Sequence, residues 1–184
     1  MNIPNSFTLM RIILIPVFVV MFYLPWHWGH FVSAMIFAVA AATDWLDGYL
    51  ARSLQQMSAL GQFLDPVADK LIVAFALVLL VGEQSLPYLA IPAAIIVGRE
   101  IGVSALREWM AELGKRASVA VSFVGKVKTC MQMVAVTMLL ATSHSFLSWI
   151  NVLGYYLLWL SAGLTVWSMF FYLKAAMREL KQAS

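Results

Sequence analysis

The chain has 184 residues, of which 62% are hydrophobic and 11% are charged, and its formal net charge is +3. Soluble domains average about 45–50% apolar residues, so this composition leaves too little polar surface to cover a globule in water and predicts an integral membrane protein. The single cysteine, Cys130, excludes an internal disulfide, and no Cys/His cluster indicates zinc.

Six apolar segments follow one another along the chain, and most reach the ~20 residues that a spanning helix needs. Their approximate bounds are residues 7–24, 31–51, 67–81, 86–110, 119–141 and 149–173. The third is short unless its helix begins before Asp65, which we expect, although Pro66 also suits the first turn of a helix capped by Asp65. The connections are brief, so we predict a single all-α domain over residues 1–184, a bundle of six transmembrane helices.

Lysine and arginine predict the orientation. The first, third and fifth connections contain neither residue, and the basic residues lie on or toward the other side. By the positive-inside rule, both termini and the second and fourth connections are cytoplasmic. Arg11 lies inside the first apolar segment rather than before it, which favours a retained helix over a cleaved signal peptide. Topology and attraction to anionic lipid account for the positive charge, so no nucleic-acid partner is needed.

All four aspartates lie between residues 44 and 69, at the predicted cytoplasmic mouth. Asp44 and Asp47 are three residues apart near the end of the second segment, and Asp65 and Asp69 are four apart near the start of the third. Each pair shares a helix face, with Cβ atoms about 5–6 Å apart, and two antiparallel helices bring the pairs together. Inserting one carboxylate near the centre of a bilayer has an unfavourable free energy of roughly 2.5–3.5 kcal/mol. The cluster therefore predicts ligands for Mg²⁺ or Mn²⁺, as a pair of ions that balances the charge.

The residues between the aspartates fit the same site. Gly48 and Ala51 share a helix face with Asp44 and permit close approach of a ligand or helix, Arg52 can bind a phosphate group, and Gly61 thins the opposing face. The whole pattern reads D-x2-D-G-x2-A-R-x8-G-x3-D-x3-D.

This pattern resembles the signature of the CDP-alcohol phosphatidyltransferases, integral membrane enzymes of phospholipid synthesis. The similarity covers nearly the whole chain. Outside the signature, it is carried by runs typical of the bacterial branch that uses glycerol 3-phosphate: Pro4-Asn5-x2-Thr8-x2-Arg11, Arg99-Glu100, Ala105-Leu106-Arg107-Glu108 and Gly125-Lys126-x-Lys128-Thr129.

The resemblance implies a multi-pass enzyme of the bacterial inner membrane, with its active site facing the cytoplasm and the surrounding lipid as a partner. Its substrates would be CDP-diacylglycerol and glycerol 3-phosphate. Asp44, Asp47 and Asp65 would bind metal, with Asp69 near the second ion. Asp69 would also act as the base that takes the proton of the 1-hydroxyl, whose oxygen attacks the β-phosphorus and releases CMP. The CDP site would be formed by Gly48, Ala51, Arg52, Gly61, Asn5 and Thr8.

A second basic set faces the same mouth and suits an anionic acceptor. It includes Arg107, Lys115, Arg116 and Lys126, although the positive-inside rule alone also predicts basic residues there. Arg99 lies eight residues before Arg107, or ~12 Å deeper along a helix. An arginine at that depth is either an internal ion-pair partner of Glu100 or a pocket residue for the acceptor phosphate.

Two other functions compete with this interpretation. A divalent-cation transporter would also bury acidic residues, but such sites lie near the midplane, often across repeated halves. A sibling enzyme would use the same donor with another alcohol, such as serine or inositol phosphate. Gly98 and Gly102 form a G-x3-G pair that could pack helices within the monomer, which we favour, or between the subunits of a homodimer.

Overall fold

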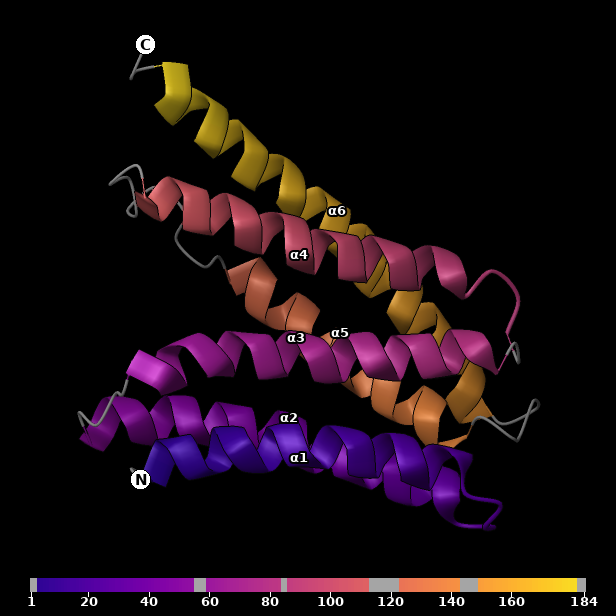
Figure 1. The fold of residues 1–184 in the computed structure, drawn as a ribbon. Helices are drawn as coiled ribbons and strands as arrows, with labels where there is room; N and C mark the ends of the chain where they lie inside the picture. Colours follow the sequence, from indigo (N-terminus) through magenta and orange to yellow (C-terminus); the bar gives the residue numbers. More distant parts are fainter. Residues whose placement is uncertain (1–2, 55–58, 84–85, 113–122, 143–148, 182–184) are drawn as a thin grey trace.

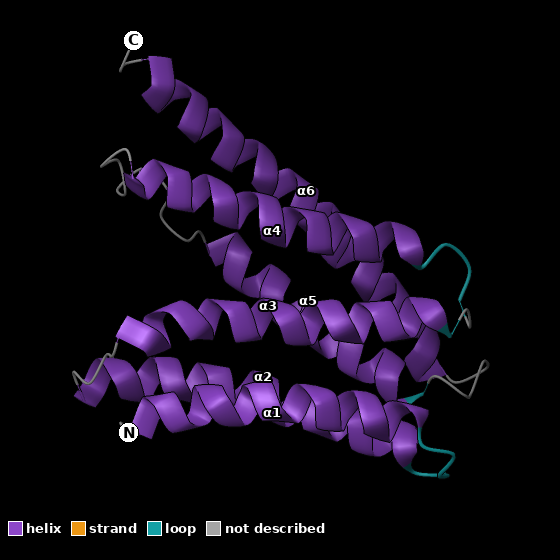
Figure 2. Ribbon diagram, in the orientation of Figure 1, coloured by secondary structure: helices purple, strands orange, loops and turns teal. Residues whose placement is uncertain are grey.

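The computed structural model describes residues 3–54, 59–83, 86–112, 123–142 and 149–181. Within these ranges the chain forms six α-helices and no strand (Figure 2). The helices are α1 (Ile3–Tyr23), α2 (Gly29–Leu54), α3 (Ala59–Gly82), α4 (Ala90–Glu112), α5 (Phe123–Ala141) and α6 (Trp149–Lys181). Consecutive helices alternate in direction, so that α1 begins and α6 ends at the same end of the bundle (Figure 1).

The helix bounds confirm most of the predicted segments. The third helix begins at Ala59, before Asp65, as expected. The prediction that Asp65 caps this helix is therefore wrong, because Pro66 lies inside α3. A proline within a helix removes one backbone hydrogen bond, and a long apolar helix tolerates that loss when its neighbours hold it in place.

The apolar core fills the half of the bundle away from the charged residues. Phe18 of α1 and Phe37 of α2 are fully buried, with ring centroids 6.3 Å apart. Leu77, Leu139 and Leu158 bring α3, α5 and α6 into the same cluster. This core joins helices that are distant in sequence and fixes the width of the opposite, polar half.

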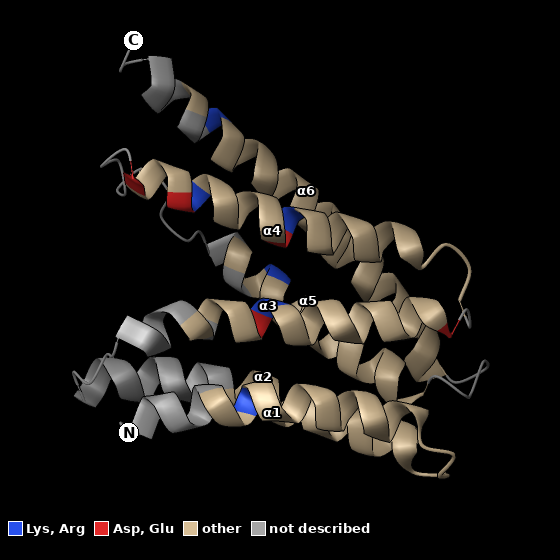
Figure 3. Cartoon of the chain, in the orientation of Figure 1, with Lys and Arg blue, Asp and Glu red and all other residues tan. Residues whose placement is uncertain are grey.

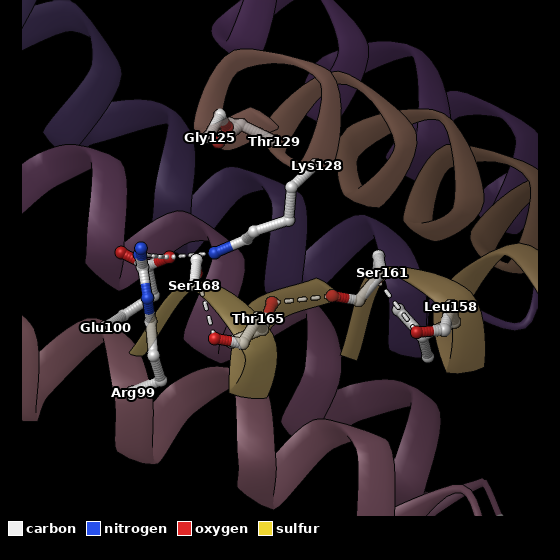
Figure 4. Close-up of polar contacts among 9 residues, drawn as sticks. All are labelled: Arg99, Glu100, Gly125, Lys128, Thr129, Leu158, Ser161, Thr165 and Ser168. Carbon is white, nitrogen blue, oxygen red and sulfur yellow. Dashed lines mark hydrogen bonds and ion pairs between the residues drawn. The ribbon is translucent and has the colours of Figure 1, made fainter. Parts of the chain in front are cut away.

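The contact between α5 and α6 is close and carries buried hydroxyl groups. Gly154 allows the approach, because a Cβ there would lie 3.1 Å from the Cβ of Met138. Along α6, Ser161, Thr165 and Ser168 donate hydrogen bonds to carbonyl oxygens of their own helix (Figure 4). These hydroxyls are therefore satisfied without water, as an apolar surrounding requires.

Charge is distributed unevenly along the bundle. Figure 3 shows acidic and basic positions gathered toward the end where α1 begins and α6 ends. At the opposite end, the connections 24–28 and 83–89 contain no Lys or Arg. Of the described residues, Trp149–Lys174 form the one stretch long and apolar enough to cross a membrane, and shorter apolar stretches occupy Leu9–Tyr23, Gly29–Thr43 and Val127–Ala141. Together with its composition, this marks a membrane-associated protein.

The G-x3-G pair lies on an exposed face of α4. A Cβ added at Gly98 or Gly102 would meet no atom within 4 Å. Our expectation that this pair packs helices within the monomer is therefore wrong, because the described helices that contact α4 lie on its other faces. The face is open to lipid or to a second chain.

Candidate active site

A cavity of about 560 Å³ opens within the charged half of the bundle. All six helices contribute to its wall. The lining residues on which the site depends are Arg11 of α1, Ala40 and Ala41 of α2, Asp69 of α3, Arg99, Glu100 and Arg107 of α4, Thr129 and Gln132 of α5, and Tyr172 of α6. The site therefore depends on the whole fold rather than on one local motif.

One side of the cavity is formed by an ion pair between the first and third helices. The Arg11 guanidinium is almost fully buried, and its Nη1 donates to Asp69 Oδ1 at 2.5 Å. The Asp69 side chain keeps 34% of its surface accessible, on the cavity side. Arg11 thus compensates and orients this carboxylate, part of whose surface is exposed in the cavity.

A second charge cluster joins the fourth and fifth helices. Glu100 Oε1 accepts hydrogen bonds from Arg99 Nη1 and from Lys128 Nζ, each at 3.0 Å (Figure 4). The Lys128 side chain is only 1% exposed, whereas that of Glu100 is 28% exposed. One carboxylate therefore faces two cations, so the cluster has a net positive charge at the cavity wall. Arg99 pairs with Glu100, as the first alternative expected, and it also lines the cavity. Its role toward an acceptor phosphate stays a prediction.

An aromatic ring from the last helix holds two arginines near each other. The guanidinium carbon of Arg99 lies 5.6 Å from the ring centroid of Tyr172, and that of Arg107 lies 5.9 Å from it. Both distances are within the ~6 Å typical of cation–π contacts. Two arginines that lie two turns apart on α4 thus approach one ring of α6, and both line the cavity.

Several predicted site residues have side chains outside the part of the structure that is described. Their backbones are helical: Asn5 and Thr8 in α1, Asp44, Asp47, Gly48, Ala51 and Arg52 in α2, Gly61 and Asp65 in α3, and Lys126 in α5. Lys115 and Arg116 lie outside the described residues altogether. The predicted CDP site and the loop contribution to the acceptor site therefore stay predictions.

The predicted metal cluster is likewise untested, because Asp69 is the one member whose side chain is described. Among the described side chains, no group of three or more His, Cys, Asp or Glu comes together. Asp69 fits a role as ligand, since it offers carboxylate oxygen, the donor that hard divalent ions prefer, to an accessible cavity.

Three residues that line this cavity were not predicted as site residues from the sequence. Arg11 appeared there as part of a motif, without its acidic partner, and Gln132 and Tyr172 were not singled out. A signal existed for Arg11 and Gln132, because each is a polar residue inside an apolar segment, where such residues are rare and functional. Tyr172 gave no signal, since tyrosine is common near membrane interfaces.

Comparison with known proteins agrees with this geometry. The sequence profile described as CDP-alcohol phosphatidyltransferase matches residues 1–167. A CDP-diacylglycerol–glycerol-3-phosphate 3-phosphatidyltransferase of Pseudomonas fluorescens is 55% identical over 182 residues, which make up 98% of this chain and 93% of the relative. Enzymes of the same name from Salmonella paratyphi A and Escherichia coli K12 are each 54% identical over 179 residues, covering 97% of both chains. The chain belongs to the CDP-alcohol phosphatidyltransferase family.

Proposed function

We propose that this protein transfers the phosphatidyl group of CDP-diacylglycerol to the 1-hydroxyl of sn-glycerol 3-phosphate, giving phosphatidylglycerophosphate and CMP. Relatives more than half identical over nearly their full length carry the name of this activity. The observation that carries the proposal is one cavity lined by a partly exposed carboxylate, Asp69, and by two arginines that approach the ring of Tyr172. This arrangement suits a small alcohol that also bears a phosphate.

Asp69 is the proposed base. Its carboxylate takes the proton of the 1-hydroxyl, the freed oxygen attacks the β-phosphorus of CDP-diacylglycerol, and the bond from that phosphorus to the oxygen leading to CMP breaks. CMP leaves with that oxygen, and no covalent enzyme intermediate forms. Arg11 holds the carboxylate in one orientation, so positioning of the two reactants supplies much of the rate.

The donor site is proposed at the ends of α2 and α3 that meet at the cavity mouth. Asp44, Asp47, Asp65 and Asp69 would hold two Mg²⁺ or Mn²⁺ ions. Such ions would supply positive charge that stabilises the negative charge developing on the leaving CMP. The nucleotide would contact Gly48, Ala51, Arg52, Gly61, Asn5 and Thr8. These roles follow from the family signature, which the chain retains at every position.

The acceptor phosphate is proposed to bind between Arg99 and Arg107. Both guanidinium groups lie at the cavity wall, and Tyr172 holds them close together. Planar guanidinium donors suit phosphate oxygens. Lys115, Arg116 and Lys126 would add positive charge at the entrance from the cytoplasm.

We propose a multi-pass topology in the bacterial inner membrane, with six spans, cytoplasmic termini and an active site that opens to the cytoplasm. Most charged positions of the described residues lie between the middle of the bundle and the end where α1 begins and α6 ends (Figure 3). The connections at the other end carry no Lys or Arg, as expected for the outer side. A homodimer is a further proposal, which the exposed Gly98 and Gly102 face of α4 would permit.

The test offers purified protein CDP-diacylglycerol with sn-glycerol 3-phosphate, serine or inositol phosphate, and measures CMP release. We expect release with glycerol 3-phosphate alone. Release with a different alcohol would identify a sibling enzyme, and the absence of release with any alcohol would favour the transporter.

A further inference from the structure

We propose that Gln132 recognises the 2-hydroxyl of glycerol 3-phosphate and so determines which phosphorylated alcohol the enzyme accepts. This inference rests on the proposed function. It adds a residue outside the family signature and outside the predicted acceptor set.

The Gln132 side chain is buried and yet unsatisfied. Gln132 is 2% exposed, it lines the cavity, and its Oε1 has no hydrogen-bond partner among the described residues. Nearly all buried polar atoms in native proteins have a partner. A buried amide oxygen that lines a cavity without a partner among the described residues therefore points to a ligand in that cavity.

Neighbouring polar side chains on α5 behave differently. Thr129 Oγ1 donates to the Gly125 carbonyl oxygen at 2.9 Å, and Thr137 Oγ1 donates to the Met133 carbonyl oxygen at 2.8 Å. Lys128, one turn from Gln132, is paired with Glu100. Among the described residues of α5, Gln132 Oε1 is the one buried side-chain polar atom without a hydrogen-bond partner.

The place of Gln132 in the fold fits the middle of the acceptor. Helix α5 packs against α3, which carries Asp69, and against α6, which carries Tyr172. Gln132 lies nine residues from the start of α5 and Asp69 ten residues from the start of α3, so each side chain is about 14–15 Å along its helix. Gln132 lines the same cavity as the proposed base, Asp69, and the two arginines of the proposed phosphate site.

Each polar group of glycerol 3-phosphate can be assigned a partner among the side chains that line the cavity. Its phosphate needs cations, which Arg99 and Arg107 provide, and its 1-hydroxyl needs the base Asp69. The 2-hydroxyl is the polar group that these residues leave unpaired. A hydroxyl both donates and accepts, so it can pair with the Gln132 carboxamide whichever way the amide is turned.

The test compares two acceptors in wild type and Gln132→Met. They are sn-glycerol 3-phosphate and 3-hydroxypropyl phosphate, which has the same phosphate and primary hydroxyl but no 2-hydroxyl. From CMP release, we expect kcat/KM of the wild type to favour glycerol 3-phosphate by about tenfold or more. Gln132→Met should remove most of that preference by lowering kcat/KM for glycerol 3-phosphate, with less than about a twofold change for the analogue.

Matched variants separate recognition from structure. Thr137→Val removes a hydroxyl from the same helix, away from the cavity wall, and should leave the preference unchanged. Gln132→Asn keeps the carboxamide but shortens its reach, so it should lower the preference for glycerol 3-phosphate severalfold. This variant provides the test if Gln132→Met does not fold. An equal loss on both acceptors, or an unchanged preference, overturns the inference while the proposed function stands. If the wild type releases no CMP with glycerol 3-phosphate, both the inference about Gln132 and the proposed function are wrong.

Discussion

Removing the charge of Glu100 should destabilise the protein through the lysine that it leaves behind. At an effective dielectric constant of about 20, unit charges 3.0 Å apart attract by about 5–6 kcal/mol, and desolvation of the ions offsets much of this gain. Glu100→Gln leaves the Lys128 ammonium, 1% exposed, beside Arg99 without an anion. Breaking one side of a buried pair costs about 3–5 kcal/mol. We expect the lower end, about 3 kcal/mol, because Glu100 itself is 28% exposed.

The double variant provides the decisive comparison. Lys128→Met should cost less, about 1–2 kcal/mol, because Glu100 keeps Arg99 as its partner. In Glu100→Gln/Lys128→Met no buried ammonium remains, so the loss should be about 2 kcal/mol smaller than the sum of the single losses.

Thermal unfolding in one detergent, followed by tryptophan fluorescence, measures these differences. For a chain of this length, 3 kcal/mol corresponds to a fall in Tm of roughly 6–12 °C. Losses that add within about 0.5 kcal/mol would show that the two residues act independently, and the account of this cluster would then be wrong.

Four further predictions follow from the same geometry. Asp69→Asn should lower CMP release at least about a hundredfold while the protein still folds, since it removes the proposed base; undiminished turnover would exclude that role. Arg107→Met should raise the KM for glycerol 3-phosphate about tenfold with little change in kcat, because it removes binding remote from the reacting atoms, whereas an unchanged KM would place the phosphate elsewhere. EDTA should abolish CMP release, and Mg²⁺ or Mn²⁺ should restore it; full activity in EDTA would contradict the metal site. Gly154→Ala should lower stability by about 1–3 kcal/mol, because its Cβ would lie 3.1 Å from Met138 Cβ, whereas Gly163→Ala, with nothing within 4 Å, should not; equal unfolding temperatures would contradict the close α5–α6 contact.

The helices were largely predictable because a bilayer imposes a length and a polarity on each one. Segments 31–51 and 149–173 agree with α2 and α6 at or near their starts. The errors came from local rules applied where tertiary packing dominates. The sequence around Pro66 resembles a helix start, yet the structure continues the helix back to Ala59, where α3 packs beside α1.

Residues that line the cavity could be predicted only where the pattern that marks them lies within one short stretch of sequence. Asp69, Arg99 and Arg107 were found by spacing and by their unusual location, and all three line the cavity. The partner of Asp69 was not found, because Arg11 lies 58 residues away and its pairing depends on how α1 meets α3. Spacing along one helix carries no information about such contacts.

The ion pairs between helices explain how the cavity can favour an acceptor with two negative charges although its own net positive charge is small. Within the described residues, four cationic and three acidic side chains line it, and Lys128 lies behind Glu100. Arg11 is compensated by Asp69, and Arg99 shares Glu100 with Lys128. The other charged lining residues are Lys70, Arg107 and Glu108, and two of the four cations, Arg99 and Arg107, lie beside Tyr172. We expect an acceptor phosphate, with up to two negative charges, to bind at this pair more strongly than the single carboxylate of serine, so the placement of the acids favours glycerol 3-phosphate.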